Sequence, residues 1–297
     1  MKISKFFVWV ALFGASVGRA EVVAEQLPEM KVGTIGVETG LSPDIWGDKP
    51  DAESILAQIK NVEKAPLNDS EKEILKRVLL TDMGGVVALE ERGEEYLQAR
   101  VEAFVAQGMM EEALVLLNQV PTQSMSNTQK QLKAEVLFVA GRAEEACAES
   151  SLEAFGSEEA FIRAACADVM GVPPASALAY EVYRESEKDT HPFLNAAGEM
   201  LYRDITASMP EGVPSVWEMP VIARVWGVDI LKLPLSKKHL WVLVGQERVP
   251  PEVRKEADNI LKRVEKVPAD GQILTHLTQM AEERRWIEPV LKGKNAK

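Results

Sequence analysis

Two cysteines, Cys147 and Cys166, are the only thiols in this 297-residue chain. As a pair they are suited either to a structural disulfide or to reversible redox chemistry. The Cys-x-x-Cys spacing that lowers a thiol pKa in redox motifs is absent. A bridge between them would close a loop of about 20 residues and add roughly 3 kcal/mol of stability by the chain-entropy argument. We therefore expect a disulfide, with two buried free thiols as the alternative if the segments that carry them do not face each other.

No pattern of histidines or carboxylates indicates a catalytic or metal site. The three histidines form no His-Glu-x-x-His or similar cluster: His191, His239 and His276. Neighbouring acids such as Glu111 and Glu112 diverge by about 100° around a helix, so such pairs do not converge on one substrate. A phosphate-binding loop, a nucleophile elbow and a dinucleotide fingerprint are also absent. We expect no catalytic residues, no cofactor and no metal, and therefore no enzyme.

The elements that must position the cysteines are helical hairpins, because one pattern occurs twice in the sequence. Residues 100–113 and 133–146 each open with a basic residue, carry a glycine eight positions later and close on Gly-x-x-Glu-Glu-Ala. The two glycines, Gly108 and Gly141, are 33 residues apart, a period typical of helical repeats. Glycine suits the end of a first helix, where a left-handed residue is often needed.

The pattern predicts first helices at 90–106 and 127–139, and second helices at 110–118 and 143–155. Ala113 and Ala146 then lie where the two helices of each hairpin press closest. A third, degenerate unit begins near Ser157 and turns at Gly171. Cys147 and Cys166 fall on helices of adjacent units that should lie antiparallel. Strand alternation is nowhere convincing, so we predict an all-α fold.

The glycine-to-alanine spacing resembles the tetratricopeptide repeat over about residues 90–205. Gly108 with Ala113, and Gly141 with Ala146, match two positions of that repeat. The aromatic and Leu-Gly positions of its first helix, and its closing proline, are not matched. The resemblance implies an α-solenoid of helical hairpins, here with a C-terminal helical module; an irregular helical bundle is the alternative.

A second resemblance covers most of the chain. Four segments carry it: Ser42 to Trp46, Leu75 to Leu80 before Thr81, Gly141 to Cys147 with Cys166, and Pro234 to Pro251. They resemble an exported proteobacterial helical-repeat family of unassigned function, whose members often carry an antifreeze label. The resemblance implies a helical solenoid outside the cytoplasm and supplies no catalytic residues. The sequence has no regular threonine-rich array of the kind that ice binding needs.

The N-terminus has the pattern of an export signal. Lys2 and Lys5 precede an apolar run from Phe6 to Val17, and a small-x-small site ends at Ala20. The run is shorter than the ~20 residues that span a bilayer, which disfavours an uncleaved anchor. We expect cleavage near Ala20, a periplasmic or secreted mature chain, and no membrane insertion after cleavage.

Charge narrows the class of partner. The whole chain has a net charge of −12, and loss of the three basic residues of the signal leaves 31 basic against 46 acidic residues, a net charge of −15. Such a charge repels phosphate backbones and anionic lipid, so we expect no nucleic-acid partner. A protein or peptide partner is the remaining expectation.

Composition along the chain suggests six parts. Prolines and glycines break helical periodicity before residue 51 and again around 209–220. We predict a signal peptide (1–20), an extended N-terminal segment (21–50), a helical-repeat domain (51–208), a linker (209–220), a C-terminal helical module (221–290) and a basic tail (291–297).

Four tryptophans are candidate anchors for a partner: Trp46, Trp217, Trp226 and Trp241. Tryptophan is enriched at interface hot spots. The alternative is that the last three form an aromatic core for the C-terminal helices, and that Trp46 packs on the first helices.

These features predict a non-catalytic periplasmic helical-repeat scaffold that binds a protein or peptide on a surface lined by the first helices of residues 90–205. One alternative is a structural subunit of a cell-envelope complex, docked through residues 21–50 or the C-terminal module. The other is an envelope enzyme, such as a peptidoglycan-acting hydrolase on a helical scaffold, which needs a buried carboxylate in a cleft.

Overall fold

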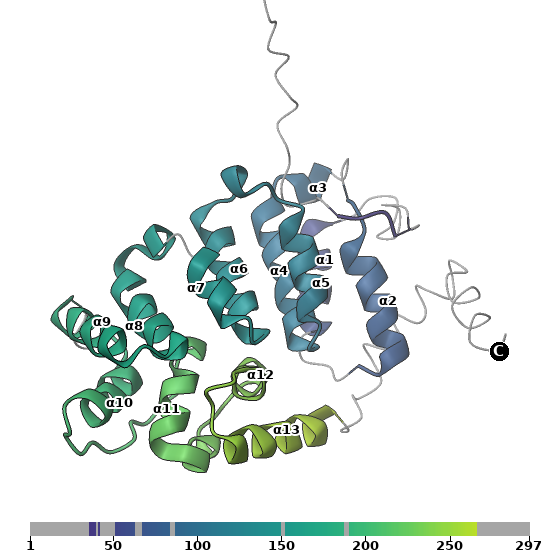
Figure 1. The fold of residues 1–297 in the computed structure, drawn as a ribbon. Coiled ribbons are helices and arrows are strands. Elements are labelled where there is room, and N and C mark those ends of the chain that lie inside the picture. Colours follow the sequence, from purple (N-terminus) through teal and green to yellow (C-terminus); the bar gives the residue numbers. More distant parts are fainter. Residues whose placement is uncertain are drawn as a thin grey trace, which may run out of the picture. The chain divides into compact units, whose positions relative to one another are not determined.

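The repeat pattern folds as three successive helical hairpins (Figure 1). Each pairs a first and a second helix: α4 (Gly93–Ala106) with α5 (Met110–Asn118), α6 (Asn127–Val139) with α7 (Ala143–Glu149), and α8 (Glu159–Met170) with α9 (Pro173–Ser186). Gly108, Gly141 and Gly171 lie at the three turns, with φ of 73°, 79° and 76°. Glycine occupies these left-handed positions because a side chain there would clash with its own backbone.

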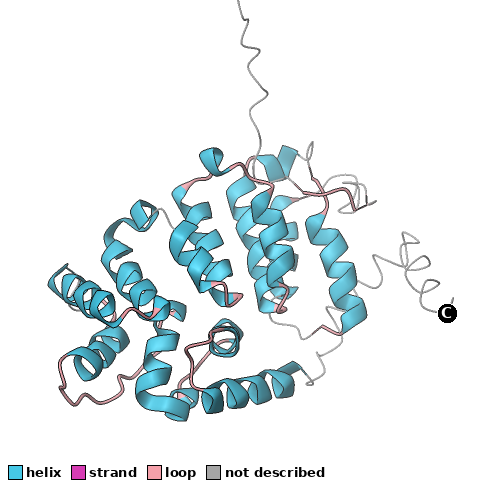
Figure 2. Cartoon of the chain, in the orientation of Figure 1, coloured by secondary structure: helices cyan, strands magenta, loops and turns pink. Residues whose placement is uncertain are grey.

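The computed structural model describes residues 36–39, 41, 51–62, 67–83, 87–149, 152–186 and 190–265. Within these ranges the chain forms helices and loops, and the single β-bridge, between Val37 and Thr81, belongs to no strand (Figure 2). The predicted all-α fold is confirmed. All of the described residues belong to one compact unit. The expected signal peptide, Trp46 and the basic tail lie outside the described residues.

Three helices precede the hairpins: α1 (Ala52–Val62), α2 (Asp69–Leu80) and α3 (Val87–Glu90). α1 packs on α4, and α2 packs on α5. The described piece of the expected N-terminal segment runs along the end of α2, where the Val37 amide donates to the Leu80 carbonyl at 2.7 Å. At Val37 the described piece is therefore paired with the end of α2.

Two predicted helices differ from the observed ones. The helix expected at 143–155 ends at Glu149, and a 3-10 helix, η4 (Leu152–Glu158), follows. Gly156 inside η4 has a φ of 54°, which no α-helix accommodates. The helix expected at 90–106 begins at Gly93, after a turn that separates it from α3.

The C-terminal half of the chain folds back onto the hairpins (Figure 1). Its helices are α10 (Pro192–Tyr202), the 3-10 helix η5 (Val216–Glu218), α11 (Met219–Trp226), the 3-10 helix η6 (Gly227–Lys232), α12 (Lys237–Gly245) and α13 (Pro251–Glu265). α11 packs on α8 and α10, and α12 packs on α4 and α6. α11 and α12, which belong to the expected C-terminal helical module, are therefore in direct contact with the repeats, and α13 packs on α12.

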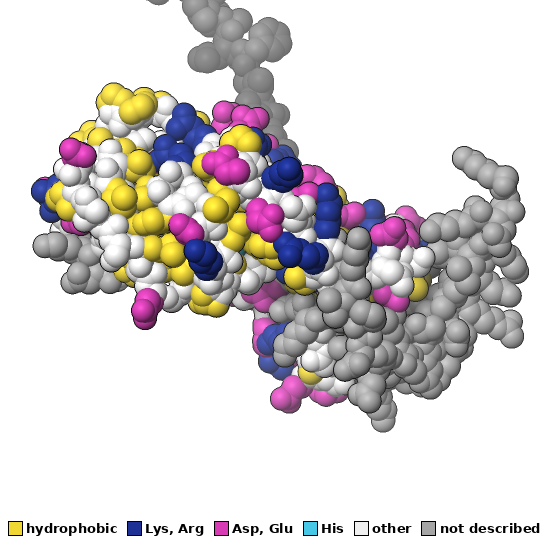
Figure 3. Space-filling model, turned by 90° about the horizontal axis from the view of Figure 1, so that it is seen from below, with side chains coloured by type: hydrophobic (Ala, Val, Ile, Leu, Met, Phe, Trp, Pro, Cys, Tyr) yellow, Lys and Arg dark blue, Asp and Glu magenta, His cyan; other side chains and the backbone are white. Residues whose placement is uncertain are grey.

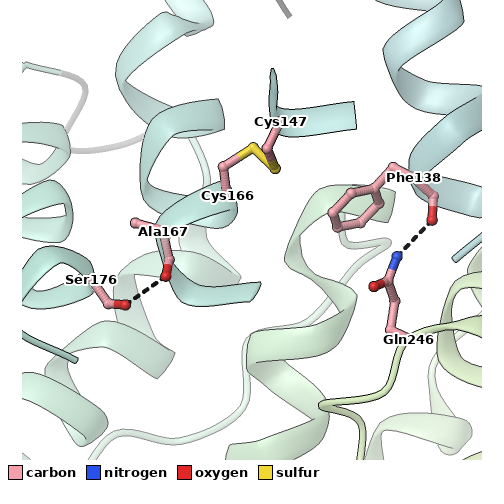
Figure 4. Close-up of a disulfide and its surroundings, with 6 residues drawn as sticks. All are labelled: Phe138, Cys147, Cys166, Ala167, Ser176 and Gln246. Atoms are coloured by element: carbon pink, nitrogen blue, oxygen red, sulfur yellow. Dashed lines mark hydrogen bonds between the residues drawn. A yellow bond between two sulfur atoms is a disulfide. The ribbon is translucent and has the colours of Figure 1, made fainter. Parts of the chain in front are cut away.

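The two cysteines form a disulfide that joins α7 to α8 (Figure 4). Their Cα atoms are 5.6 Å apart, and the bridge closes a loop of 19 residues in sequence separation. α7 is only seven residues long, so it has few helical hydrogen bonds of its own. The disulfide therefore fixes this short helix covalently to the next hairpin. Among the described helices, none combines the length and apolar character that a membrane crossing requires.

Replacing both cysteines should destabilise the fold through this link. The Cys147→Ala/Cys166→Ala variant is expected to lose about 3 kcal/mol of unfolding free energy, because the unfolded chain regains the entropy of an open loop. Urea denaturation followed by circular dichroism measures the loss. Wild-type protein treated with a dithiol reductant should fall to a similar stability, and an unchanged denaturation midpoint in both would contradict this account of the disulfide.

Candidate recognition surface

A segment that follows the hairpins in the sequence, residues 241–248, covers their turns. It comprises the second half of α12 and the loop after it, and we call it the clasp. A methyl group added at Gly108 would lie 2.6 Å from the Trp241 ring, and one added at Gly141 would lie 2.6 Å from the Gly245 carbonyl oxygen. At Gly171 the added methyl would overlap the guanidinium group of Arg248. Gly108 and Gly141 are therefore needed twice, for their left-handed backbone and for the close approach of the clasp, whereas at Gly171 the flexible end of Arg248 can move aside.

Two clasp side chains also bind the ends of first helices. The Gln246 amide donates to the Phe138 carbonyl, near the end of α6, at 2.7 Å (Figure 4). Arg248 donates to the Asp168 carbonyl at 3.4 Å and to the Gly171 carbonyl at 3.2 Å, at the end of α8. The Phe138 and Asp168 carbonyls also accept from the Gly141 and Gly171 amides, at 3.1 and 3.2 Å, so the clasp side chains add a second donor at these helix ends. The sequence analysis did not single out Gln246 or Arg248, because neither residue belongs to a repeat.

Three of the four candidate tryptophans lie within the described residues, and their surroundings differ. Trp217 is only 5% exposed, with its ring centroid 4.2 Å from that of Phe138. It belongs to the core, so the expectation that it anchors a partner is wrong. Trp241 packs against Gly108, and Trp226 is half-buried against the core. The aromatic-core alternative therefore describes the C-terminal tryptophans better than a row of exposed anchors does.

The repeat alanines lie inside the hairpins. Ala113 and Ala146 are both fully buried. Their small side chains let the paired helices approach closely, as the spacing predicted.

Two buried carboxylates join separate elements: Asp168 links the third hairpin to α10 and α11, and Glu218 links η5 to α10. Asp168 on α8 accepts a hydrogen bond of 2.7 Å from the Tyr202 hydroxyl and is paired with Arg224 on α11. Burial raises the pKa of Asp168, against the opposing effect of the Arg224 charge, and burial together with Asp168 raises the pKa of Tyr202 to about 12. Glu218 accepts from the Leu194 and Ser215 amides at 2.9 and 2.6 Å, and burial raises the pKa of its carboxyl. These contacts cross between elements and assign both carboxylates a structural role.

A groove lies between the first helices of the first two hairpins. It has a volume of about 280 Å³, and its lining residues come from α4 and α6: Glu94, Glu95, Leu97, Gln98, Thr128, Gln129 and Leu132. A second cavity of about 530 Å³ lies at the Gly141 turn, between α7, the end of α8 and the clasp. Neither Asp168 nor Glu218 lines either of these cavities. The groove is thus on the surface that the repeat pattern predicted for recognition.

The groove has an apolar floor and a polar rim. Leu97 is buried and Leu132 half-buried, whereas Glu94 and Gln98, one turn apart on α4, are exposed. Glu95 is paired with Arg92 and Lys60, and the hydrogen bond from Arg92 lowers the pKa of its carboxyl. Such a surface can bind an apolar side chain flanked by a cation or an amide. No group of three or more metal-ligating side chains is found among the described residues.

The chain has no match among protein-family models, curated proteins or solved structures. The fold and its surfaces define an all-α protein built on three hairpins whose turns are covered by its own C-terminal segment.

Gln246 should contribute more to stability than a surface glutamine that makes a similar hydrogen bond. Gln246→Ala is expected to cost about 0.5–1.5 kcal/mol, because the Phe138 carbonyl loses its second donor and keeps only the Gly141 amide. The matched control is Gln119→Ala, since the exposed Gln119 also donates to a backbone carbonyl. That variant should cost less than about 0.5 kcal/mol. Equal losses by chemical denaturation would contradict a capping role for the clasp.

His239 on α12 is fixed in its neutral form. Its Nδ1 accepts from the Ser236 amide at 3.1 Å, which assigns the proton to Nε2, and Nε2 then donates to the Pro214 carbonyl at 2.8 Å. Burial lowers the pKa of His239 from 6.5. A lowered pKa in the folded state means that protonation opposes folding.

The stabilisation from His239 should therefore be present above pH 6.5 and be lost as the pH falls through the lower, folded-state pKa. Unfolding free energies of wild type and His239→Gln, measured between about pH 7.5 and about pH 5.5, should converge toward acid pH. Subtracting the variant cancels His191, whose pKa burial also lowers. If the difference in unfolding free energy between the two proteins does not change with pH, protonation of His239 does not oppose folding.

Proposed function

We propose that this chain is an exported, non-catalytic helical-repeat scaffold that binds a protein or peptide partner in the groove between α4 and α6. The observation that carries the proposal is the groove itself, which lies between the first helices of adjacent hairpins. Helical repeats commonly use surfaces formed by successive units to bind extended partners.

The surrounding structure supports a scaffold outside the cytoplasm. A disulfide joins two hairpins, and disulfides persist mainly in oxidising compartments. The export signal proposed from Lys2 to Ala20 agrees with such a compartment. The resemblance to the exported proteobacterial family supports the same compartment. The resemblance to tetratricopeptide repeats supports an α-solenoid built from the hairpins.

The groove indicates the chemistry of the partner. Glu94 makes no salt bridge with a described residue, and Gln98 lies beside it on the same rim. The mature chain has a net charge of −15, which favours association with basic partners. We therefore propose a partner segment that places a lysine or arginine near Glu94 and an apolar side chain against Leu132.

Site-specific photocrosslinking in the native envelope tests this proposal. A photoreactive residue at Gln98 should capture a specific partner, and Glu94→Lys should lower the yield by about tenfold through charge reversal at the rim. Glu91→Lys is the matched control, because it makes the same charge change at an exposed position outside the groove lining. It should leave the yield unchanged. No capture at Gln98, or equal effects of the two lysine variants, would contradict partner binding in the groove.

A further inference from the structure

The cavity at the Gly141 turn is formed by three parts of the chain. α7 supplies one wall, the end of α8 supplies a second with Val169 and Met170, and the clasp supplies the third. The backbones meet at Gly141 and Gly245, where a methyl group added to Gly245 would lie 3.1 Å from the Gly141 Cα atom. Backbone contact fixes this wall. The volume of about 530 Å³ falls within the ~300–1,000 Å³ that is typical of small-molecule sites.

A buried hydrogen-bond acceptor lines the cavity without a donor. Gln246 is only 2% exposed. Its amide nitrogen donates to the Phe138 carbonyl, and its Oε1 atom is turned away from that carbonyl (Figure 4). No described residue donates to this oxygen. A buried acceptor without a donor is unfavourable, so Gln246 favours an occupant that brings an N–H group to this part of the cavity.

The acidic residues of the cavity are only partly neutralised. Arg142 donates two hydrogen bonds to Glu145, at 2.7 and 2.5 Å, and these two charges offset each other. Glu144 and Glu247 are exposed side chains that form no ion pair within the described part of the chain. Two carboxylates that line the cavity are therefore available to a cation.

Arg248 adds a positive charge to the same cavity. Within the described ranges it donates only to two backbone carbonyls, at 3.4 and 3.2 Å, and it forms no ion pair. A guanidinium group has five N–H donors in a fixed fork. Arg248 therefore keeps donors for an anion, and a carboxylate can accept two parallel hydrogen bonds from such a fork.

The combination of these groups points to a ligand with both charges. Apolar and charged side chains also mix on the surface seen from below (Figure 3), but the cavity adds a concave shape and a buried acceptor. Glu144 and Glu247 would repel a purely anionic ligand, and Arg248 would repel a purely cationic one. A zwitterion satisfies all three charges. Since it has no net charge, the negative charge of the whole chain does not repel it.

We propose that the cavity at the Gly141 turn binds a short zwitterionic peptide. Its terminal ammonium group donates to Gln246 Oε1 and lies near the two unpaired glutamates, and its terminal carboxylate accepts from Arg248. An apolar side chain of the peptide packs on the α8 wall. An extended chain rises by ~3.3–3.6 Å per residue, so a dipeptide separates its terminal charges by about 7 Å. Such a ligand can bridge acidic and basic groups that line one cavity without pairing with each other.

Leucyl-leucine is the probe, and NMR titration of the mature chain measures its dissociation constant. We expect a value below about 1 mM. N-acetyl-leucyl-leucine lacks the ammonium group, and leucyl-leucinamide lacks the carboxylate. Each capped peptide should bind at least about tenfold more weakly, because it leaves a charged group of the cavity unpaired.

Two variants assign each end of the peptide to its protein groups. Arg248→Met should weaken leucyl-leucine by at least about tenfold without weakening leucyl-leucinamide, which has no carboxylate to lose. Glu144→Gln/Glu247→Gln should weaken leucyl-leucine similarly without weakening the acetylated peptide. The matched controls make the same charge changes at exposed positions outside the cavity lining, and each should alter the dissociation constant by less than about threefold: Arg163→Met and Glu185→Gln/Glu252→Gln.

The absence of leucyl-leucine binding up to about 10 mM, or equal affinities for the three peptides, would overturn the proposal. Equal weakening of all three peptides by Arg248→Met or by the double glutamate variant would also overturn it. The cavity is separate from the groove between α4 and α6, so Glu94→Lys should bind leucyl-leucine like wild type. Failure of peptide binding would therefore leave the proposed partner binding untouched, and the converse also holds.

Discussion

The structure depends on the close approach of the clasp to three left-handed glycines. Each glycine ends a first helix, and each meets a different part of the clasp: the Trp241 ring, the Gly245 backbone and the Arg248 guanidinium. A side chain at any of these turns would strain the backbone, and at Gly108 and Gly141 it would also occupy the space that the clasp needs. One short segment thereby lies against the ends of three hairpins, and α12, which carries part of the clasp, packs on α4 and α6.

This arrangement limits where a partner can bind. The turn edge of the hairpins carries the clasp, and the C-terminal helices are joined to the third hairpin by the buried Asp168–Arg224 pair. Among the described residues, the groove between α4 and α6, which has an acidic rim, and the cavity at the Gly141 turn remain open. The groove suits a cation beside an apolar group.

Local signals in the sequence predict the hairpins, but they do not predict the clasp. The observed α5 and α6 have the predicted bounds, because glycine at a left-handed turn and a capping residue are local requirements. The disulfide followed from the placement of its cysteines on adjacent helices. Gln246, by contrast, acts on a carbonyl 108 residues earlier, and no local pattern encodes such a distance. Trp217 was proposed as an anchor for the same reason: only the tertiary path of the chain reveals that it is covered by Phe138 and Phe155.

A double-mutant cycle between Gly108 and Trp241 tests the central contact most directly. Gly108→Ala is measured in the wild-type chain and in a Trp241→Leu chain, where the ring that faces the turn is removed and an apolar side chain remains. If the clasp packs on the turn, the cost of the added methyl group should fall in the Trp241→Leu background by about 1 kcal/mol or more, toward the cost of a left-handed alanine alone. The same cost in both backgrounds would show that Trp241 and the turn are not coupled, and the account of the clasp would be contradicted.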